Sequence, residues 1–236
     1  ISWFFMSKEF YFSVTDVLED LKLAKNYNNF LADLVIKHCP NNNGLTLDFG
    51  AGKGFITNLV LPYIPKTYAL ELDPNLRKEL KSNGLKTYKS LSEFSNNSLD
   101  YIYSLNVLEH IHDDKKCIQE FFRKLKSGGK LFLYLPAFNI LYSSLDKKAE
   151  HFRRYSKNTL EQKILSESFI IKQCYYVDSV GFFAAIMYKY FGSQDGDLNP
   201  RSIIFFDRFI FPVSTILDTF LGRFFGKNIV LIAEKI

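Results

Sequence analysis

The stretch Leu47-Asp48-Phe49-Gly50-Ala51-Gly52-Lys53-Gly54-Phe55 joins a short apolar run to a helical pattern through three glycines. Glycine has no Cβ atom, so it lets a backbone turn tightly and approach a ligand closely. In an open α/β sheet, ligands bind beyond the carboxyl ends of the strands, which is where such a turn lies. The stretch therefore predicts a strand, a cofactor-binding turn and a helix.

Strand and helix patterns alternate outward from this turn. Strands are expected over residues 45–49, 67–71, 85–88, 99–103, 130–135, 169–177 and 228–233. A leading helix is expected over 15–39, a helix over 113–126 that Gly128 and Gly129 end, and a loop over 139–155. This alternation predicts one domain over residues 1–236 with an α/β, Rossmann-like, doubly wound sheet covered by helices on both faces.

An aromatic-rich insertion of about residues 179–226 separates the last two strand patterns. Its apolar side chains form two helical stripes, which are Val180, Phe183, Ala184, Met187, Tyr188 and Phe191, and Val213, Ile216, Leu217, Phe220, Leu221 and Phe224. Two interpretations stay open: a helical lid buried on the sheet, or a surface for a membrane or hydrophobic acceptor. Charged residues and a proline interrupt the segment, so no transmembrane span is expected.

Two cofactors compete for the glycine turn. A dinucleotide site needs a third glycine where this chain has Phe55, and Asp48 would place a negative charge near bound phosphates. S-adenosylmethionine has no phosphate and carries an ammonium and a sulfonium, which a carboxylate suits. Glu71 ends the second strand about twenty residues later, where a carboxylate can accept hydrogen bonds from ribose hydroxyls. These details favour the methyl donor over NAD.

Four motifs in order carry a family resemblance, and they span Leu47–Gly54, Glu71–Pro74, Leu99–His110 and Leu125–Leu131. Together they resemble class I S-adenosylmethionine-dependent methyltransferases, especially the small-molecule group that includes the hydroxylated-quinone O-methyltransferases. The resemblance covers roughly residues 45–136. It implies a seven-stranded sheet whose last strand is antiparallel, with S-adenosyl-L-methionine as the cofactor.

The resemblance also implies which residues hold the cofactor. Around the methionine part it places Asp48, Gly50, Ala51, Gly52 and Gly54. Glu71 is expected to hold the ribose and Leu72 to pack on the adenine, with Ser90 and Leu91 flanking the adenine edge. Leu105 and Asn106 are expected near the sulfonium.

Methyl transfer is an in-line displacement, and a hydroxyl acceptor benefits from a base, for which histidine is suited near neutral pH. His151 is the leading candidate, with His110, Arg154 and Tyr155 as further catalytic candidates. The alternatives are a loop held by ion pairs and a His110 that orients the helix start. The quinone relatives pair a Glu-x-x-Glu-His motif with a metal, but Asn106 replaces the first carboxylate here, so no metal is expected.

The expected function is methyl transfer from S-adenosylmethionine to a small or lipid-linked acceptor, with oxygen as the expected target. An NAD-dependent oxidoreductase and a non-catalytic S-adenosylmethionine-binding protein remain alternatives. Asn106 is not followed by the Pro-Pro-aromatic sequence of nucleobase amino-methyltransferases, so no nucleic-acid partner is expected. Three scattered cysteines and no signal-peptide pattern at the start favour a cytoplasmic setting. The net charge of +5 leaves peripheral contact with the inner face of a membrane open.

Overall fold

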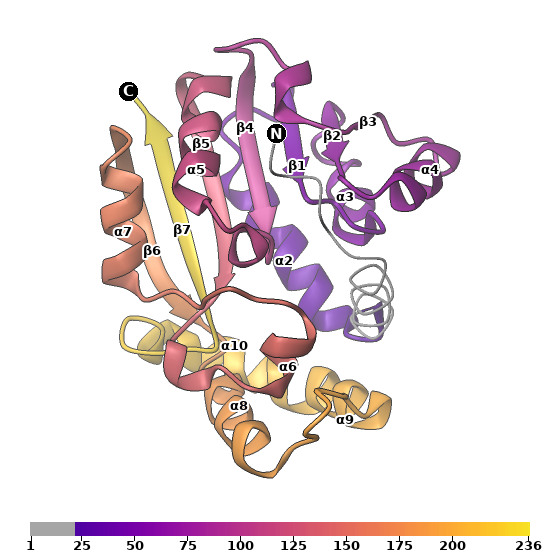
Figure 1. Cartoon of the computed structure of the whole chain (residues 1–236), viewed down its shortest axis with the longest axis vertical. Coiled ribbons are helices and arrows are strands. Elements are labelled where there is room, and N and C mark those ends of the chain that lie inside the picture. Colours follow the sequence, from indigo (N-terminus) through magenta and orange to yellow (C-terminus); the bar gives the residue numbers. More distant parts are fainter. Residues whose placement is uncertain (1–21) are drawn as a thin grey trace.

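A seven-stranded mixed sheet carries the fold of residues 22–236, the part of the chain that this computed structural model describes (Figure 1). Its order is β3-β2-β1-β4-β5-β7-β6, and β7 runs antiparallel to both of its neighbours. The strands are β1 (Thr46–Phe49), β2 (Thr67–Leu70), β3 (Thr87–Tyr88), β4 (Leu99–Leu105), β5 (Leu125–Pro136), β6 (Phe169–Val177) and β7 (Asn228–Lys235). The predicted Rossmann-like sheet with an antiparallel last strand is confirmed.

Helices cover both faces of this sheet. They are α2 (Lys25–His38), α3 (Phe55–Val60), α4 (Pro74–Ser82), α5 (Asp114–Lys124), α6 (Ser144–Lys148), α7 (Lys157–Leu165), α8 (Ser179–Phe191), α9 (Pro200–Phe205) and α10 (Phe211–Leu221). Successive side chains of a strand point to opposite faces. Along β5, Leu131 and Leu133 therefore join the core that α5 covers, whereas Phe132 and Tyr134 join the core that α2 covers.

The leading helix differs from the prediction at its start. Residues 15–21 lie outside the described part of the chain, and α2 begins only at Lys25, after a break at Leu23 and Ala24. The carboxylate of Asp207, far along the chain, accepts hydrogen bonds from the backbone nitrogens of Asn26 (3.0 Å) and Tyr27 (2.9 Å). These amides have no partner within the helix, so Asp207 stabilises the point where α2 begins.

Two predicted boundaries around β5 are wrong. The glycine pair does not cap α5, because the helix ends at Lys124 and β5 starts at Leu125, which pairs with Leu99 of β4. Gly128 lies within the irregular start of this strand with a φ of +75°. Backbone pairing with β4 outweighs the local capping signal.

The expected loop over 139–155 contains the short 3₁₀ turn η3 (Asn139–Leu141) and α6. A capping box explains α6, since the Asp146 carboxylate reaches back to the backbone nitrogen of Ser143 at 2.9 Å. The prediction that residues 139–155 form a plain loop is therefore wrong. The helix α6 gives Asp146 a fixed position.

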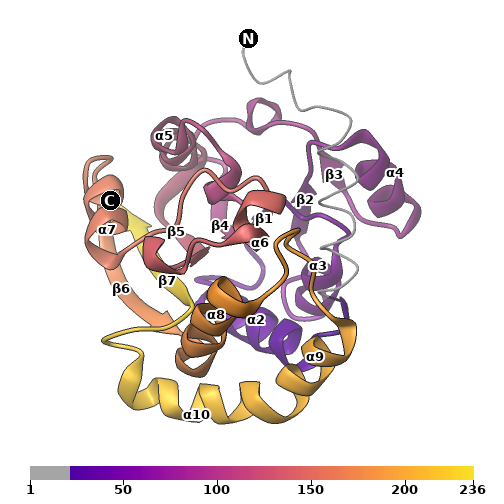
Figure 2. The same ribbon diagram turned by 60° about the horizontal axis from the view of Figure 1, so that its bottom comes forward.

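Helices α8, α9 and α10, with the π-helical turn η4 (Phe206–Ile210), fill the connection between β6 and β7. They gather at the end of the molecule toward which β4 and β5 point, the lower end in Figure 1 and the near side in Figure 2. Few of their residues are buried: only Ser179, Gly181, Asp207, Phe211 and Ser214. The buried-lid interpretation of the two stripes is therefore wrong, because these helices contact the sheet through a narrow inner side.

Candidate active site

The glycine turn after β1 has the backbone geometry that the sequence predicts. Gly50, Gly52 and Gly54 have φ values of +82°, +54° and +75°, in the left-handed region that favours glycine. The backbone nitrogens of Gly50 and Ala51 both donate to the Leu70 carbonyl, at 2.8 and 3.0 Å, which ties the turn to the end of β2. A Cβ atom on Gly50 would lie 2.4 Å from Val107, so the turn closes only with glycine at this position.

Gly50→Ala should destabilise the chain by about 1–3 kcal/mol more than Gly84→Ala, because only the first substitution adds a clash to the strained φ. The two glycines share a φ of +82°, but a Cβ atom on Gly84 would meet nothing within 4 Å. Urea unfolding of both variants measures the difference. Equal losses would show that Val107 moves aside at no cost.

Glu71 links the turn to the end of β2. Its carboxylate accepts hydrogen bonds from the backbone nitrogens of Gly52 (2.8 Å) and Asp73 (2.9 Å). Burial raises the pKa of this carboxyl, and the two amides act in the opposite direction. A carboxylate has about four lone-pair sites, so two stay available for the hydroxyls of a ribose. Leu72, beside it, is 48% exposed and leaves an apolar side chain open to a ring.

Asp48 is buried beneath the glycine turn. Its side chain is buried, and one carboxylate oxygen accepts a hydrogen bond from the Thr57 hydroxyl at 2.6 Å. Burial raises the pKa of this carboxyl to about 7. Through Thr57, Asp48 joins β1 to α3, and its expected contact with the methionine part of the cofactor stays a prediction.

The remaining predicted cofactor residues lie at the same edge of the sheet. Ser90 follows β3, and its hydroxyl accepts from the backbone nitrogen of Ser92 at 3.1 Å, so it caps the turn η1 (Leu91–Glu93). Leu105 ends β4 half-buried, and Asn106 follows it with a φ of +52°. Turns after β1, β2, β3 and β4 therefore meet where a parallel sheet binds its ligand.

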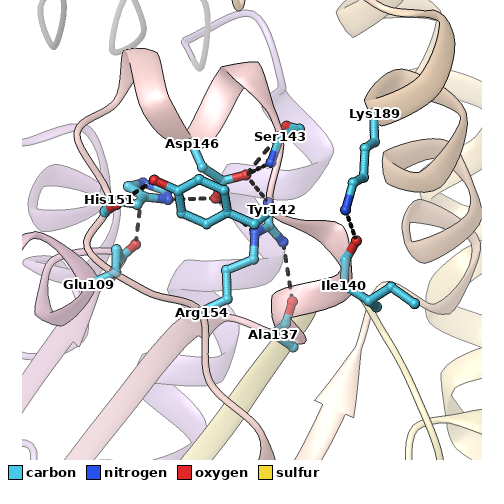
Figure 3. Close-up of polar contacts among 9 residues, drawn as sticks. All are labelled: Glu109, Ala137, Ile140, Tyr142, Ser143, Asp146, His151, Arg154 and Lys189. Atoms are coloured by element: carbon cyan, nitrogen blue, oxygen red, sulfur yellow. Dashed lines mark hydrogen bonds and ion pairs between the residues drawn. The ribbon is translucent and has the colours of Figure 1, made fainter.

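A second group of residues lies in the segment after β5 (Figure 3). The Asp146 carboxylate bonds Nδ1 of His151 at 2.8 Å and accepts from Nε and Nη2 of Arg154 at 2.7 and 3.0 Å. Tyr142 donates its hydroxyl to the His151 carbonyl at 2.8 Å. The imidazole of His151 is thus held through its ring and through its backbone.

The protonation state of Asp146 determines which ring nitrogen of His151 is available to accept a proton. Burial alone would raise the pKa of Asp146, but the hydrogen bonds from His151 and Arg154 lower it to about 2. An ionised carboxylate can only accept, so Nδ1 of His151 carries the proton. Nε2 then has a free lone pair, which is the arrangement of a histidine base held by a carboxylate.

Glu109 and His110, on the 3₁₀ turn η2 (Leu108–His110), meet His151 at this point. Oε1 of Glu109 lies 3.9 Å from Nε2 of His151, and the two histidine rings stand edge to face with centroids 4.6 Å apart. Burial raises the pKa of Glu109 to about 8, and burial with the neighbouring His151 lowers that of His110 to about 3. At pH 7 the site therefore holds a neutral carboxylic acid and a neutral imidazole beside the free Nε2.

Comparison with known proteins identifies the part of the site formed by the glycine turn and Glu71. Residues 47–133, which run from β1 into β5 and include the turn and Glu71, match the methyltransferase domain family. These residues form a class I S-adenosylmethionine-dependent methyltransferase domain. The predicted family is confirmed, and with it the cofactor that the domain uses.

Relatives of the methyltransferase domain are distant. "Uncharacterized protein MJ0638" of Methanocaldococcus jannaschii is 31% identical over 53% of this chain and 59% of that protein. A ubiquinone biosynthesis O-methyltransferase of Xanthomonas oryzae pv. oryzae is 30% identical over 37% of this chain and 41% of that protein. This chain thus spans less than two thirds of either relative. A solved S-adenosylmethionine-dependent methyltransferase of Archaeoglobus fulgidus shares the fold, with a TM-score of 0.59 at 13% identity over 88% and 94% of the two chains.

Arg154 and Tyr155, two of the further catalytic candidates, make structural contacts here. All three guanidinium nitrogens of Arg154 are used, because Nη1 donates to the Ala137 carbonyl at 3.2 Å while Nε and Nη2 hold Asp146. Tyr155 is buried and donates its hydroxyl to Asp114 at 2.9 Å. Both residues position the methyltransferase domain's loop, and the expectation that ion pairs anchor it applies to Arg154.

Two residues of the site were missing from the predicted catalytic set. Asp146 lies five residues before His151 and orients it, and Glu109 lies 42 residues before it. The spacing of five residues between Asp146 and His151 was a usable signal in the sequence. Asp146 lies in α6 and His151 follows soon after this helix ends, so the two side chains can meet. The Glu109 pairing was not a usable signal, because it depends on how the segment after β5 folds back over η2.

Glu109, His110 and His151 also have the composition of a metal site. One potential ligand atom from each lies within 4.8 Å of the others. Within residues 22–236, both carboxylate oxygens of Glu109 and Nδ1 of His110 have no hydrogen-bond partner. Two imidazoles and a carboxylate are ligands that Zn²⁺ and related ions accept, and Asp146 supplies the outer carboxylate that often orients a ligating histidine. The expectation of no metal stays a prediction that chelation can test.

Glu109→Gln should make the free energy of unfolding fall less steeply as the pH rises from about 4.5 to about 8. In this range the raised pKa makes the folded chain bind more protons than the unfolded chain, so the wild type loses stability with rising pH. Relative to the wild type, the variant should gain about 3–5 kcal/mol between the two ends of the range. Urea unfolding at both ends measures it, with the exposed Glu79→Gln as a control that should show no such gain.

Proposed function

We propose that this chain transfers the methyl group of S-adenosylmethionine to a hydroxyl oxygen of a small or lipid-like acceptor, with His151 as the general base. The observation that carries the proposal is the Asp146–His151 pair, whose free Nε2 faces Glu109 beside the cofactor edge of the methyltransferase domain. The oxygen target is also the one in the name of the Xanthomonas relative.

On the cofactor side, the residues present fit S-adenosylmethionine. The glycine turn has the left-handed backbone that lets it bend tightly at the ligand edge of the sheet, Glu71 has free acceptor sites for the ribose, and Leu72 is exposed for the adenine. When bound, the cofactor supplies a methyl group on a positively charged sulfur. The chain's own task is then to align the acceptor oxygen with that methyl group and to remove its proton.

On the acceptor side, Nε2 of His151 accepts the hydroxyl proton as the oxygen attacks. The ring then carries two protons and a positive charge, which the ionised Asp146 stabilises at 2.8 Å. Glu109, neutral at pH 7, can donate a hydrogen bond that orients the acceptor oxygen without adding a competing negative charge. The proton passes from His151 to solvent after the product leaves.

A two-stage experiment tests the proposal. Calorimetric titration with S-adenosylmethionine, S-adenosylhomocysteine and NADH should show micromolar binding of the first two alone. Transfer of labelled methyl groups is then measured on a panel of phenols, catechols, prenylated hydroxyquinones and matching amines. Products from hydroxyl acceptors support the proposal, whereas products from amines alone overturn the oxygen target. Cofactor binding with no product from any acceptor favours a non-catalytic role.

Glu71→Gln should weaken the binding of S-adenosylhomocysteine by about 10–100-fold, because an amide replaces the charged acceptor of two ribose hydrogen bonds. Glu79→Gln, an exposed change on α4, should leave the affinity within about twofold. Calorimetry gives both affinities, and circular dichroism shows whether the variants are folded. Unchanged affinity in a folded Glu71→Gln variant would contradict the assignment of Glu71 to the ribose.

A further inference from the structure

Helices α8 to α10 present their apolar side chains to solvent. More than half of the exposed large hydrophobic side chains of the described residues, 12 of 21, lie between Phe183 and Phe224. The most exposed include Phe191 (79%) and Phe220 (72%). We call this surface the aromatic face, and its main residues are Phe183, Phe191, Phe209, Ile216, Phe220 and Phe224.

A few aromatic contacts, such as the buried Phe211 against Tyr27 and Phe30 of α2, hold these helices to the rest of the chain together with buried polar residues. Asp218 accepts hydrogen bonds from the backbone nitrogens of Asp178 and Ser179 at 2.7 and 2.8 Å. Ser214 is buried and donates to Asp178, while Asp207 caps α2. A helix on the surface of a water-soluble protein normally turns its apolar side inward. Here much of the apolar side is outward, so a further surface is needed to cover it.

The exposed charges of the α9 and α10 part of the aromatic face have one sign. From α9 to Arg223, just after α10, the acids Asp207 and Asp218 point inward, whereas Arg201, Arg208 and Arg223 are exposed. None of these arginines forms an ion pair within the described part of the chain. The exposed acids of the region lie in the loop between α8 and α9, where Asp197 pairs with Lys148.

We propose that the aromatic face docks on the surface of an anionic lipid bilayer, with α9 and α10 lying in its interface. Exposed aromatic and aliphatic side chains with arginines beside them are the features of helices that lie in a membrane surface. A second copy of the chain is a poorer occupant, because a symmetric contact would bring the same three arginines together. No helix of the described residues is long and apolar enough to cross a membrane.

Docking in this way would bring the candidate active site close to the bilayer. Lys189 of α8 donates to the Ile140 carbonyl at 2.7 Å, which ties α8 to the segment after β5 that carries Asp146 and His151 (Figure 3). Ile140 is itself 63% exposed beside this contact. A lipid-like acceptor could then reach His151 from the membrane surface, although docking itself does not depend on catalysis.

Vesicle co-sedimentation of the full chain tests the proposal. Vesicles of phosphatidylcholine with about 30 mol% phosphatidylglycerol should bind the wild type at least about tenfold more tightly than phosphatidylcholine alone, and salt should weaken the binding. The double variant Phe220→Ser, Phe224→Ser should lose about tenfold or more, because these side chains supply buried apolar area at the interface. The triple variant Arg201→Gln, Arg208→Gln, Arg223→Gln should lose the preference for anionic vesicles.

Two control variants match these changes elsewhere on the surface. Tyr63→Ser with Leu165→Ser removes two exposed apolar side chains, and Lys78→Gln with Lys81→Gln and Lys115→Gln removes three exposed positive charges. Both controls should bind like the wild type. Equal binding by all variants would overturn the proposal, and so would a wild type that ignores vesicles or forms a dimer that Phe220→Ser, Phe224→Ser dissolves. Because the readout is sedimentation, failure of the methyl-transfer proposal would not affect it.

Discussion

His151→Ala should lower kcat for methyl transfer to a hydroxyl acceptor by about 10²–10⁴-fold, the usual contribution of a positioned general base. Nε2 of His151 is the free nitrogen of a ring whose Nδ1 is held by Asp146 at 2.8 Å. Without it, the acceptor oxygen must lose its proton to water. S-adenosylhomocysteine should still bind within about twofold, because the glycine turn and Glu71 are not altered.

Three further measurements separate a base from a merely structural histidine. Added imidazole should restore part of kcat in His151→Ala. His112→Ala, which removes an exposed histidine from the start of α5, should keep full activity. If EDTA abolishes wild-type activity and Zn²⁺ restores it, the Glu109–His110–His151 cluster binds an ion and His151 is a ligand. Full activity of His151→Ala would contradict both roles.

The cofactor half of the site could be predicted from the sequence because its determinants are local. Gly50, Gly52 and Gly54 lie in one turn, and Glu71 follows the next strand of a parallel sheet, so fold and spacing together place them. The errors arose where a distant partner decides a local structure. Asp207 determines where α2 begins, and pairing with β4 extends β5 through a glycine pair that resembles a helix end.

The acceptor half was predicted less well for the same reason. The sequence placed His151 and Arg154 on one loop. It could not show that the guanidinium of Arg154 donates its hydrogen bonds to Asp146 and to the Ala137 carbonyl. It also could not bring Glu109 to His151, since they belong to separate turns. Likewise, the aromatic stripes were visible in the sequence, but helical periodicity alone does not say whether an apolar stripe faces the sheet or the solvent.

Asp146→Ala should destabilise the chain by about 3–5 kcal/mol, the cost of breaking a buried ion pair by removing one partner. Asp146 is fully buried, and the Arg154 side chain is only 7% exposed. The substitution would leave that guanidinium charged and without its carboxylate, and it would also release His151 and the backbone nitrogen of Ser143. Urea unfolding measures the loss, and Asp33→Ala on the exposed side of α2 should cost less than about 0.5 kcal/mol.

The pH dependence of this loss follows from the pKa of Asp146, which is about 2 in the folded chain against an ordinary value of 3.8. A depressed pKa means that the unfolded chain binds more protons in this range, so Asp146 contributes stability above about pH 4 that is lost as the pH falls toward 2. This pH-dependent part of the free energy of unfolding should amount to about 2–3 kcal/mol in the wild type, and it should be absent from Asp146→Ala.

A double substitution separates the ion pair from the packing around it. Asp146→Leu combined with Arg154→Met replaces both charges by apolar groups, which often restores stability at a buried pair. We expect the double variant to recover at least half of the stability lost in Asp146→Ala, while its kcat stays as low as that of Asp146→Ala because Nδ1 of His151 has no carboxylate. If kcat recovered together with stability, Asp146 would only support the loop. His151 would then act as a base without a carboxylate on its Nδ1.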